Sequence, residues 1–96
     1  MGKATLIFRD KQVDPVDGSI TEMVLWQLEE PVPGSKHRFK YRLFYGSPDR
    51  PLVRYDNERG KGDHRHVEGR EEPYGFTDEN RLVEDFLADR HRLGGK

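Results

Sequence analysis

The stretch that decides the fold is HRFKYRLFY, which spans residues 37–45. Apolar and basic side chains alternate along it with a period of two. The apolar set is Phe39, Tyr41, Leu43 and Tyr45, and the basic set is Arg38, Lys40 and Arg42. Successive residues of a strand point to opposite faces of a sheet, so this alternation predicts a β-strand. We expect one face of the strand to lie against a core and the other to face solvent.

Outward from this strand, the sequence alternates between apolar or β-branched stretches and turn-forming stretches rich in proline and glycine. The turns are expected at residues 14–18, 31–35 and 46–51, where Pro presets φ and Gly accepts a positive φ. The further strands are expected at residues 5–10, 20–29, 52–56 and, after a charged loop, 66–68. Short connections join neighbouring strands, so the sequence predicts an antiparallel meander of four to five strands.

The C-terminal segment changes to helical spacing. Thr77 is the expected N-cap, and Gly94 is expected to end the helix. The apolar stripe between them is Leu82, Val83, Phe86 and Leu87. Tyr74 and Phe76 are expected to pack this helix of about four turns onto one face of the sheet. The predicted fold class is therefore α+β, in a single compact domain over residues 1–96.

The composition limits what the chain can do. Charged residues make up 36% and hydrophobic residues 32%, so either the domain is marginally stable alone or a partner or second copy covers part of it. The net charge of -1 predicts nothing about nucleic acid, and the lack of Cys excludes disulfides and thiolate metal sites. No apolar run reaches the length of a membrane span, and the N-terminus lacks a signal-peptide pattern. We expect a cytoplasmic protein without membrane contact.

The basic face of the strand over residues 37–45 is a candidate nucleic-acid surface. Arg38, Lys40 and Arg42 recur every second residue, about 6–7 Å apart, which is comparable to the phosphate spacing along a nucleic-acid strand. Arg54 strengthens this interpretation if it lies on the same face of a neighbouring strand. The alternative is a solvated face whose cations pair with acidic residues on adjacent strands.

Residues 54–66, RYDNERGKGDHRH, are the richest in potential chemistry. They hold three acidic residues, four basic residues and two histidines. In an extended chain His64 and His66 point the same way, which suits a general base and a general acid acting on a ribose 2′-hydroxyl and its phosphate. The candidates to bind and stabilise the phosphate are Arg54, Arg59, Lys61 and Arg65. Gly60 and Gly62 either shape this loop or open it to a phosphate.

Other roles for these residues remain open at this stage. Asp56, Asp63, His64 and His66 are donors that could hold Mn²⁺, Zn²⁺ or Mg²⁺ for hydrolysis, although the neighbouring cations disfavour this. Asp56 either caps a turn with Asn57 or orients a histidine. The loop is alternatively an ordinary exposed connection. The P-loop and Rossmann patterns are absent, so an NTPase or dinucleotide enzyme is not expected.

Several of these motifs together resemble a known family. They are Tyr55-Asp56-Asn57, a Gly-containing loop, His64-x-His66, Tyr74-x-Phe76 and the terminal Leu82…Asp85-Phe86 helix. In this order, over about residues 53–86, they resemble the TumE family of toxins of bacterial and archaeal toxin–antitoxin systems. Many members of that family have a longer, Pro- and His-rich loop than the present Glu58–Asp63. The resemblance implies a toxin neutralised by a cognate antitoxin, often a helix-turn-helix DNA-binding protein.

Three functional hypotheses follow. The first is a type II toxin that cleaves RNA without a metal or other cofactor, with His64 and His66 moving protons. The second is a non-catalytic module that binds RNA, DNA or a partner protein. The third is a metal-dependent nuclease that uses the Asp and His residues of the charged loop.

Overall fold

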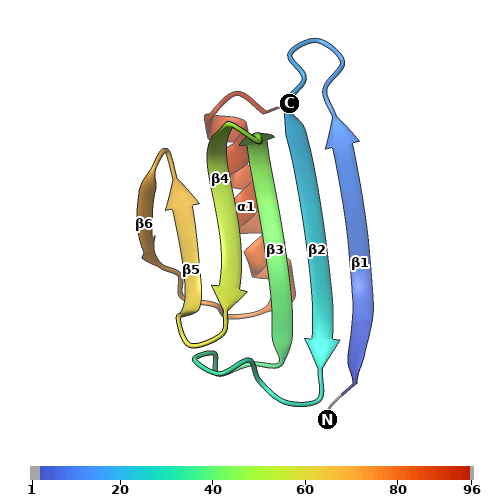
Figure 1. The fold of residues 1–96 in the computed structure, drawn as a ribbon, viewed down its shortest axis with the longest axis vertical. Helices are drawn as coiled ribbons and strands as arrows, with labels where there is room; N and C mark the ends of the chain where they lie inside the picture. Colours follow the sequence, from blue (N-terminus) through green and yellow to red (C-terminus); the bar gives the residue numbers. More distant parts are fainter. Residues whose placement is uncertain (1–2, 96) are drawn as a thin grey trace.

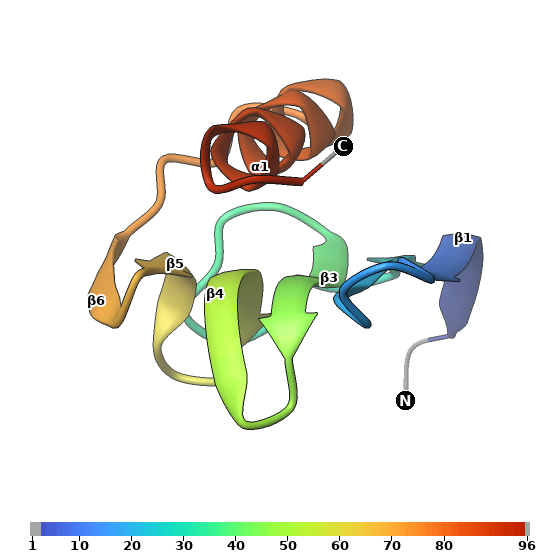
Figure 2. The same ribbon diagram turned by 90° about the horizontal axis from the view of Figure 1, so that it is seen from above.

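The computed structural model describes residues 3–95, which form one antiparallel sheet with a helix on one face (Figures 1 and 2). The elements in chain order are β1 (Ala4–Val13), β2 (Ile20–Leu28), β3 (Phe39–Ser47), β4 (Arg50–Glu58), β5 (Gly62–Val67), β6 (Arg70–Pro73) and α1 (Glu79–Arg92). Each strand pairs with the next, so the spatial order equals the chain order. The α+β class and the meander topology are confirmed.

The core lies between α1 and the middle of the sheet. The apolar face predicted for β3 is buried, with Tyr41, Leu43 and Tyr45 each at most 3% exposed. Leu82 and Phe86 of the predicted helical stripe are fully buried against it. The helix contacts β3 and β4, whereas β1 extends beyond its cover (Figure 2). The opposite face of the sheet has no such cover from the described chain.

The strand count of four to five was wrong, because residues 3–95 form six strands. The segment expected as a charged loop after Asp56 is mostly a hairpin, in which Asn57 and Glu58 complete β4 and Gly62 begins β5. Chain direction then reverses at Glu68 and Gly69, with φ angles of 51° and 83°, and β6 pairs with β5. Two consecutive positive φ values match the tight turns that suit hairpins. β6 could not be predicted from the sequence, because its residues show no apolar alternation and all are exposed.

The helix begins one residue later than predicted. Asp78, rather than Thr77, is the N-cap, since its backbone is extended and its carboxylate accepts a hydrogen bond from the Arg81 amide at 2.8 Å. Gly94 follows the C-cap with a φ of 103°, as expected for a left-handed helix end. Tyr74 packs edge-on against Tyr55 of β4 and donates a hydrogen bond to Asp85 of α1, so it links the helix to the sheet as predicted.

Candidate functional site

The uncovered face of the sheet brings together the two predicted histidines and two of the predicted cations, Arg42 and Arg54. Cross-strand pairing places Arg42 of β3 beside Asp56 of β4, which in turn lies beside His64 of β5. One step along, Arg54 pairs with His66, and His66 pairs with Glu71 of β6. Residues two apart on a strand share a face, so these two rows form one continuous surface. Arg54 therefore shares the face of Arg42, as the nucleic-acid hypothesis requires.

His64 is the most buried member of this surface, at 5% exposure. Its Nδ1 lies 3.1 Å from the carbonyl oxygen of Gly62, and its Nε2 lies 2.6 Å from Oδ1 of Asp56, so both ring nitrogens face oxygens that can accept a hydrogen bond. The side chain of Asp56 therefore contacts a histidine on the neighbouring strand, and its role as an orienting group stays a prediction.

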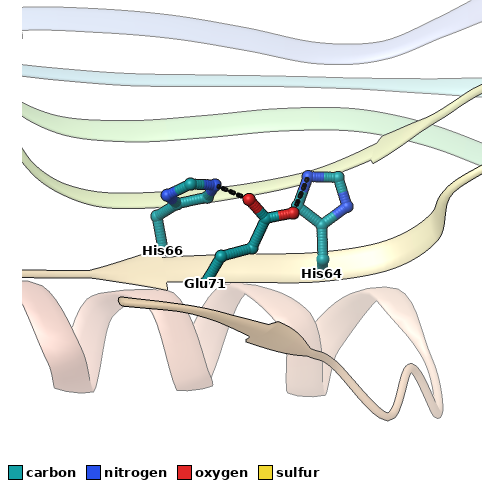
Figure 3. Close-up of side chains that lie close together, drawn as sticks. All are labelled: His64, His66 and Glu71. Atoms are coloured by element: carbon teal, nitrogen blue, oxygen red, sulfur yellow. Dashed lines mark ion pairs between the residues drawn. The ribbon is translucent and has the colours of Figure 1, made fainter. Parts of the chain in front are cut away.

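Glu71 joins the two histidines. Its Oε2 lies 2.7 Å from Nε2 of His66, and its Oε1 lies 3.9 Å from Nε2 of His64. Figure 3 shows the carboxylate between the two imidazoles, whose ring centroids are 6.0 Å apart. Sequence reasoning missed Glu71 because β6 was not predicted. The only available signal was the hairpin turn at Glu68 and Gly69, which places Glu71 opposite His66.

Two of the cations on this face are already paired with acidic groups. Nε of Arg54 lies 3.4 Å from Oδ2 of Asp56, and Nη1 of Arg42 lies 3.1 Å from Glu22. The alternative of charge pairing therefore holds for these two cations, and nucleic-acid binding by this face stays a prediction. The guanidinium of Arg42 also lies over the Phe44 ring, 5.5 Å from its centroid.

The remaining predicted cations lie nearer the turns. Lys61 forms an exposed ion pair with Glu58 at 3.6 Å and lines a hollow with His64 and Glu71. Lys40 and Arg59 line a separate hollow together with Lys3. Arg38 is exposed and precedes β3, outside the strand in which it was expected.

Arg65 and Asp63 lie on the opposite, helix-bearing side of β5, away from His64 and His66. Arg65 donates hydrogen bonds to the Tyr55 hydroxyl, Asp89 and Glu72, and these partners raise its pKa. The structure therefore does not bring Arg65 to the cluster in which a phosphate-stabilising role was expected.

Asp63 takes part in a second histidine network that the sequence did not suggest. It accepts hydrogen bonds from Ser35 at 2.7 Å and from the Tyr41 hydroxyl at 2.6 Å, and it lies 2.6 Å from Nε2 of His37. Phe76 stacks on the His37 ring with centroids 3.7 Å apart. Every polar group here has a partner, so this network joins the loop before β3 to β5 and leaves Asp63 with no part in a metal site at His64.

The glycines of the β4–β5 turn serve packing. Gly62 has a φ of 76°, and a Cβ there would lie 2.9 Å from the carbonyl oxygen of Gly34. The Gly60 amide donates to the carbonyl of Pro33 at 2.6 Å. The loop after β2 thus presses directly on this turn, which supports the loop-shaping role of Gly60 and Gly62 over the phosphate-binding one.

Two groups of side chains among the described residues have donors close enough to share a metal ion. They are His64, His66 and Glu71, and Asp56, Glu58 and His64, each with its ligand atoms within 4.8 Å of one another. Imidazole with carboxylate suits Zn²⁺ and other first-row divalent metals. Chemically, the same groups can move protons or hold a cation.

Comparison with known proteins places the chain in a family. No curated protein and no solved structure matches it. No helix within residues 3–95 is long and apolar enough to cross a membrane. A family model described as "Toxin TumE" matches residues 2–93. This range includes the six strands, the helix and the histidine cluster, by which we mean His64, His66, Asp56 and Glu71. The chain therefore belongs to the TumE family of toxins.

Proposed function

We propose that this toxin is an endoribonuclease that works without a metal at the histidine cluster of the uncovered sheet face. One observation carries the proposal: His64 and His66 lie side by side, each against a carboxylate, on the same face as Arg42 and Arg54. Two imidazoles whose ring centroids are 6.0 Å apart can act on either side of one phosphodiester.

The chemistry needs no further reactant. One imidazole removes the proton of the ribose 2′-hydroxyl while its oxygen attacks phosphorus, and the other imidazole gives a proton to the departing 5′-oxygen. The products are a 2′,3′-cyclic phosphate and a 5′-hydroxyl end. Asp56 and Glu71 hold the two rings, and Arg54 stabilises the negative charge that develops on the phosphate.

The test is induced expression in bacteria of wild type beside His64→Ala/His66→Ala and the control His91→Ala, which removes an exposed histidine of α1. Growth arrest and RNA fragments with 5′-hydroxyl ends are expected from wild type and the control only. The general base and acid together contribute at least about a hundredfold in rate, so the double variant should leave RNA intact. Circular dichroism checks that all three proteins fold. Arrest by the folded double variant contradicts the mechanism.

A specific observation favours a second candidate, a non-catalytic nucleic-acid-binding toxin. Lys3, Lys40 and Arg59 line one hollow away from the histidines, where Glu29 and Glu30 offset two of the three positive charges. A site with this remaining positive charge binds phosphate without turnover and loses affinity as salt rises. In that case Lys40→Ala/Arg59→Ala should relieve growth arrest, whereas the double histidine variant should remain toxic with RNA intact.

We further propose that a cognate antitoxin, a helix-turn-helix DNA-binding protein, binds this toxin in a type II system in the cytoplasm. Membership of a toxin family and a hydrophobic content of only 32% support a partner. Co-expression with the product of the neighbouring gene should restore growth and yield a complex of the two proteins. Light scattering of the toxin alone measures its mass in solution. A monomer is expected if only the antitoxin covers the toxin, and a mass of two chains would indicate a homodimer.

A further inference from the structure

The histidine cluster contains a buried oxygen without a hydrogen-bond partner. Asp56 is 8% exposed, and its Oδ1 accepts no hydrogen bond although it lies 2.6 Å from Nε2 of His64. The two atoms are in contact without the alignment that a hydrogen bond requires. A buried acceptor left in this state is costly, because it has given up its hydration without a replacement. A cation beside these two atoms would remove that cost.

The rings are arranged as metal ligands usually are. The Nδ1 of His64 lies 3.1 Å from the Gly62 carbonyl oxygen, which can only accept a hydrogen bond, and Nε2 faces the cluster. Metal-binding histidines nearly always donate the other ring N–H to a backbone carbonyl or a carboxylate in this way. His66 also turns its Nε2 toward the same carboxylate of Glu71 (Figure 3).

The distances require only small movements. In a tetrahedral site with bonds of about 2.0–2.1 Å, neighbouring ligand atoms are about 3.4 Å apart. His66 Nε2 and Glu71 Oε2 are now 2.7 Å apart, and His64 Nε2 and Glu71 Oε1 are 3.9 Å apart. Glu71 is exposed on β6, so its side chain can make these adjustments of about 0.5–0.7 Å.

The local charge also permits a cation. Asp56 and Glu71 each contribute a negative charge, and Arg54 contacts only Oδ2 of Asp56, at 3.4 Å. Lys61 lines the same hollow as Glu71 but is paired with Glu58. One negative charge therefore remains before any metal binds. Arg42 is paired with Glu22 and does not add to the repulsion.

We propose that His64, His66 and Glu71 bind a divalent first-row transition metal such as Zn²⁺, with Asp56 as the nearest fourth donor. The consequence for activity rests on the proposed function: a metal on both Nε2 atoms takes the lone pairs that proton transfer needs, so occupancy silences the acid–base nuclease. Binding itself is tested without RNA.

The experiment titrates Zn²⁺ into untagged, chelator-treated full-length protein by calorimetry, and repeats the titration with Co²⁺ while its visible absorption is recorded. The variants are His64→Ala, Glu71→Gln and the control His91→Ala. Wild type and control should bind Zn²⁺ in a saturable manner, give an intense Co²⁺ spectrum of imidazole coordination and gain thermal stability. Loss of an outer-shell partner typically weakens binding by about 10–100-fold, and loss of a ligand should weaken it at least as much.

Glu71→Gln keeps the shape of an exposed side chain, so its fold should be intact even if His64→Ala unfolds. Absence of saturable binding, or equal binding by Glu71→Gln and wild type, overturns the proposal.

A parallel RNA assay separates the metal-site proposal from the proposed nuclease function. Zn²⁺ inhibition supports both, whereas cleavage that a chelator abolishes leaves the metal site standing and refutes the metal-independent mechanism. If the protein cleaves RNA through the histidines but binds no metal, the metal-independent mechanism stands and the metal site is refuted.

Discussion

At the scale of single residues, Asp56 and Asn57 show how one dipeptide serves both faces of the sheet. Asp56 contacts His64 on the uncovered face. Asn57 is fully buried, where its Oδ1 accepts from the Tyr41 amide at 3.0 Å and its Nδ2 donates to the Phe39 carbonyl at 2.7 Å. The side-chain amide thus replaces the backbone of β4 at the point where it leaves β3. The sequence argument that such residues stand in for backbone groups at strand ends is correct for Asn57.

Asn57→Asp tests this role. The change keeps an acceptor for the Tyr41 amide but leaves the Phe39 carbonyl without its donor and buries a carboxylate beside it. We expect a loss of about 1–3 kcal/mol or more in the free energy of unfolding, the usual cost of a buried polar group without a partner. Urea denaturation measures it. The control is Asn80→Asp in the first turn of α1, where an acid is favourable and stability should not fall. Equal effects at both positions would show that Asn57 has no special role.

At the scale of elements, Arg65 anchors β5 on the side of the sheet that bears the helix. Its hydrogen bonds to Tyr55 of β4 and Asp89 of α1 tie three elements together, and Asp89 also accepts from Tyr55 and Arg92. Successive residues of a strand point to opposite faces, so when Arg65 is held on the helix side, the residues before and after it point to the other side. Arg65 therefore helps to position His64 and His66 without touching them.

The consequence is a change in stability rather than in chemistry. Arg65→Met should lower the free energy of unfolding by about 1–2 kcal/mol, less than the 1.5–3 kcal/mol of a buried charged hydrogen bond because the side chain is 33% exposed. Arg81→Met, which removes an exposed pair with Asp85 within α1, should cost only about 0.3–0.5 kcal/mol. Denaturant titration compares the two. Below its unfolding transition Arg65→Met should still cleave RNA, and a folded but inactive variant would restore the catalytic role expected from the sequence.

The elements also show how far the sequence could lead. β3 and α1 were predictable because each buries one face, which leaves a clear period of apolar residues. β6 buries nothing and leaves no period, so Glu71, the residue that joins the two histidines, could not be found. Asp63 was placed with His64 because residues 57–65, between the strands predicted at 52–56 and 66–68, were expected to form a loop. Once β5 is known to begin at Gly62, strand alternation alone separates Asp63 and Arg65 from the histidines.

At the scale of the whole molecule, the two faces of the sheet differ in what they carry. The side that α1 covers (Figure 2) holds the buried aromatic core and the hydrogen-bond networks that stabilise it. The other side carries the charged cluster. Three tyrosines of the helix side donate to carboxylates: Tyr41 to Asp63, Tyr55 to Asp89 and Tyr74 to Asp85. Burial, and then the hydrogen bond to the carboxylate, raise the pKa of all three phenols. They stay protonated in the folded protein well above the pH at which an exposed tyrosine ionises.

This arrangement predicts alkaline unfolding. The ordinary pKa of tyrosine is about 10, so above this pH the unfolded chain loses phenolic protons that the folded chain retains. The unfolded state then binds fewer protons than the native state, and stability falls as pH rises; below about pH 9 the three phenols have no such effect. Urea denaturation near pH 8 and near pH 11 should show this loss, which Tyr55→Phe/Tyr74→Phe should reduce. Phenolate absorbance from these residues should appear only together with the loss of circular dichroism, and ionisation of all four tyrosines in a protein that keeps its native spectrum would contradict the assignment.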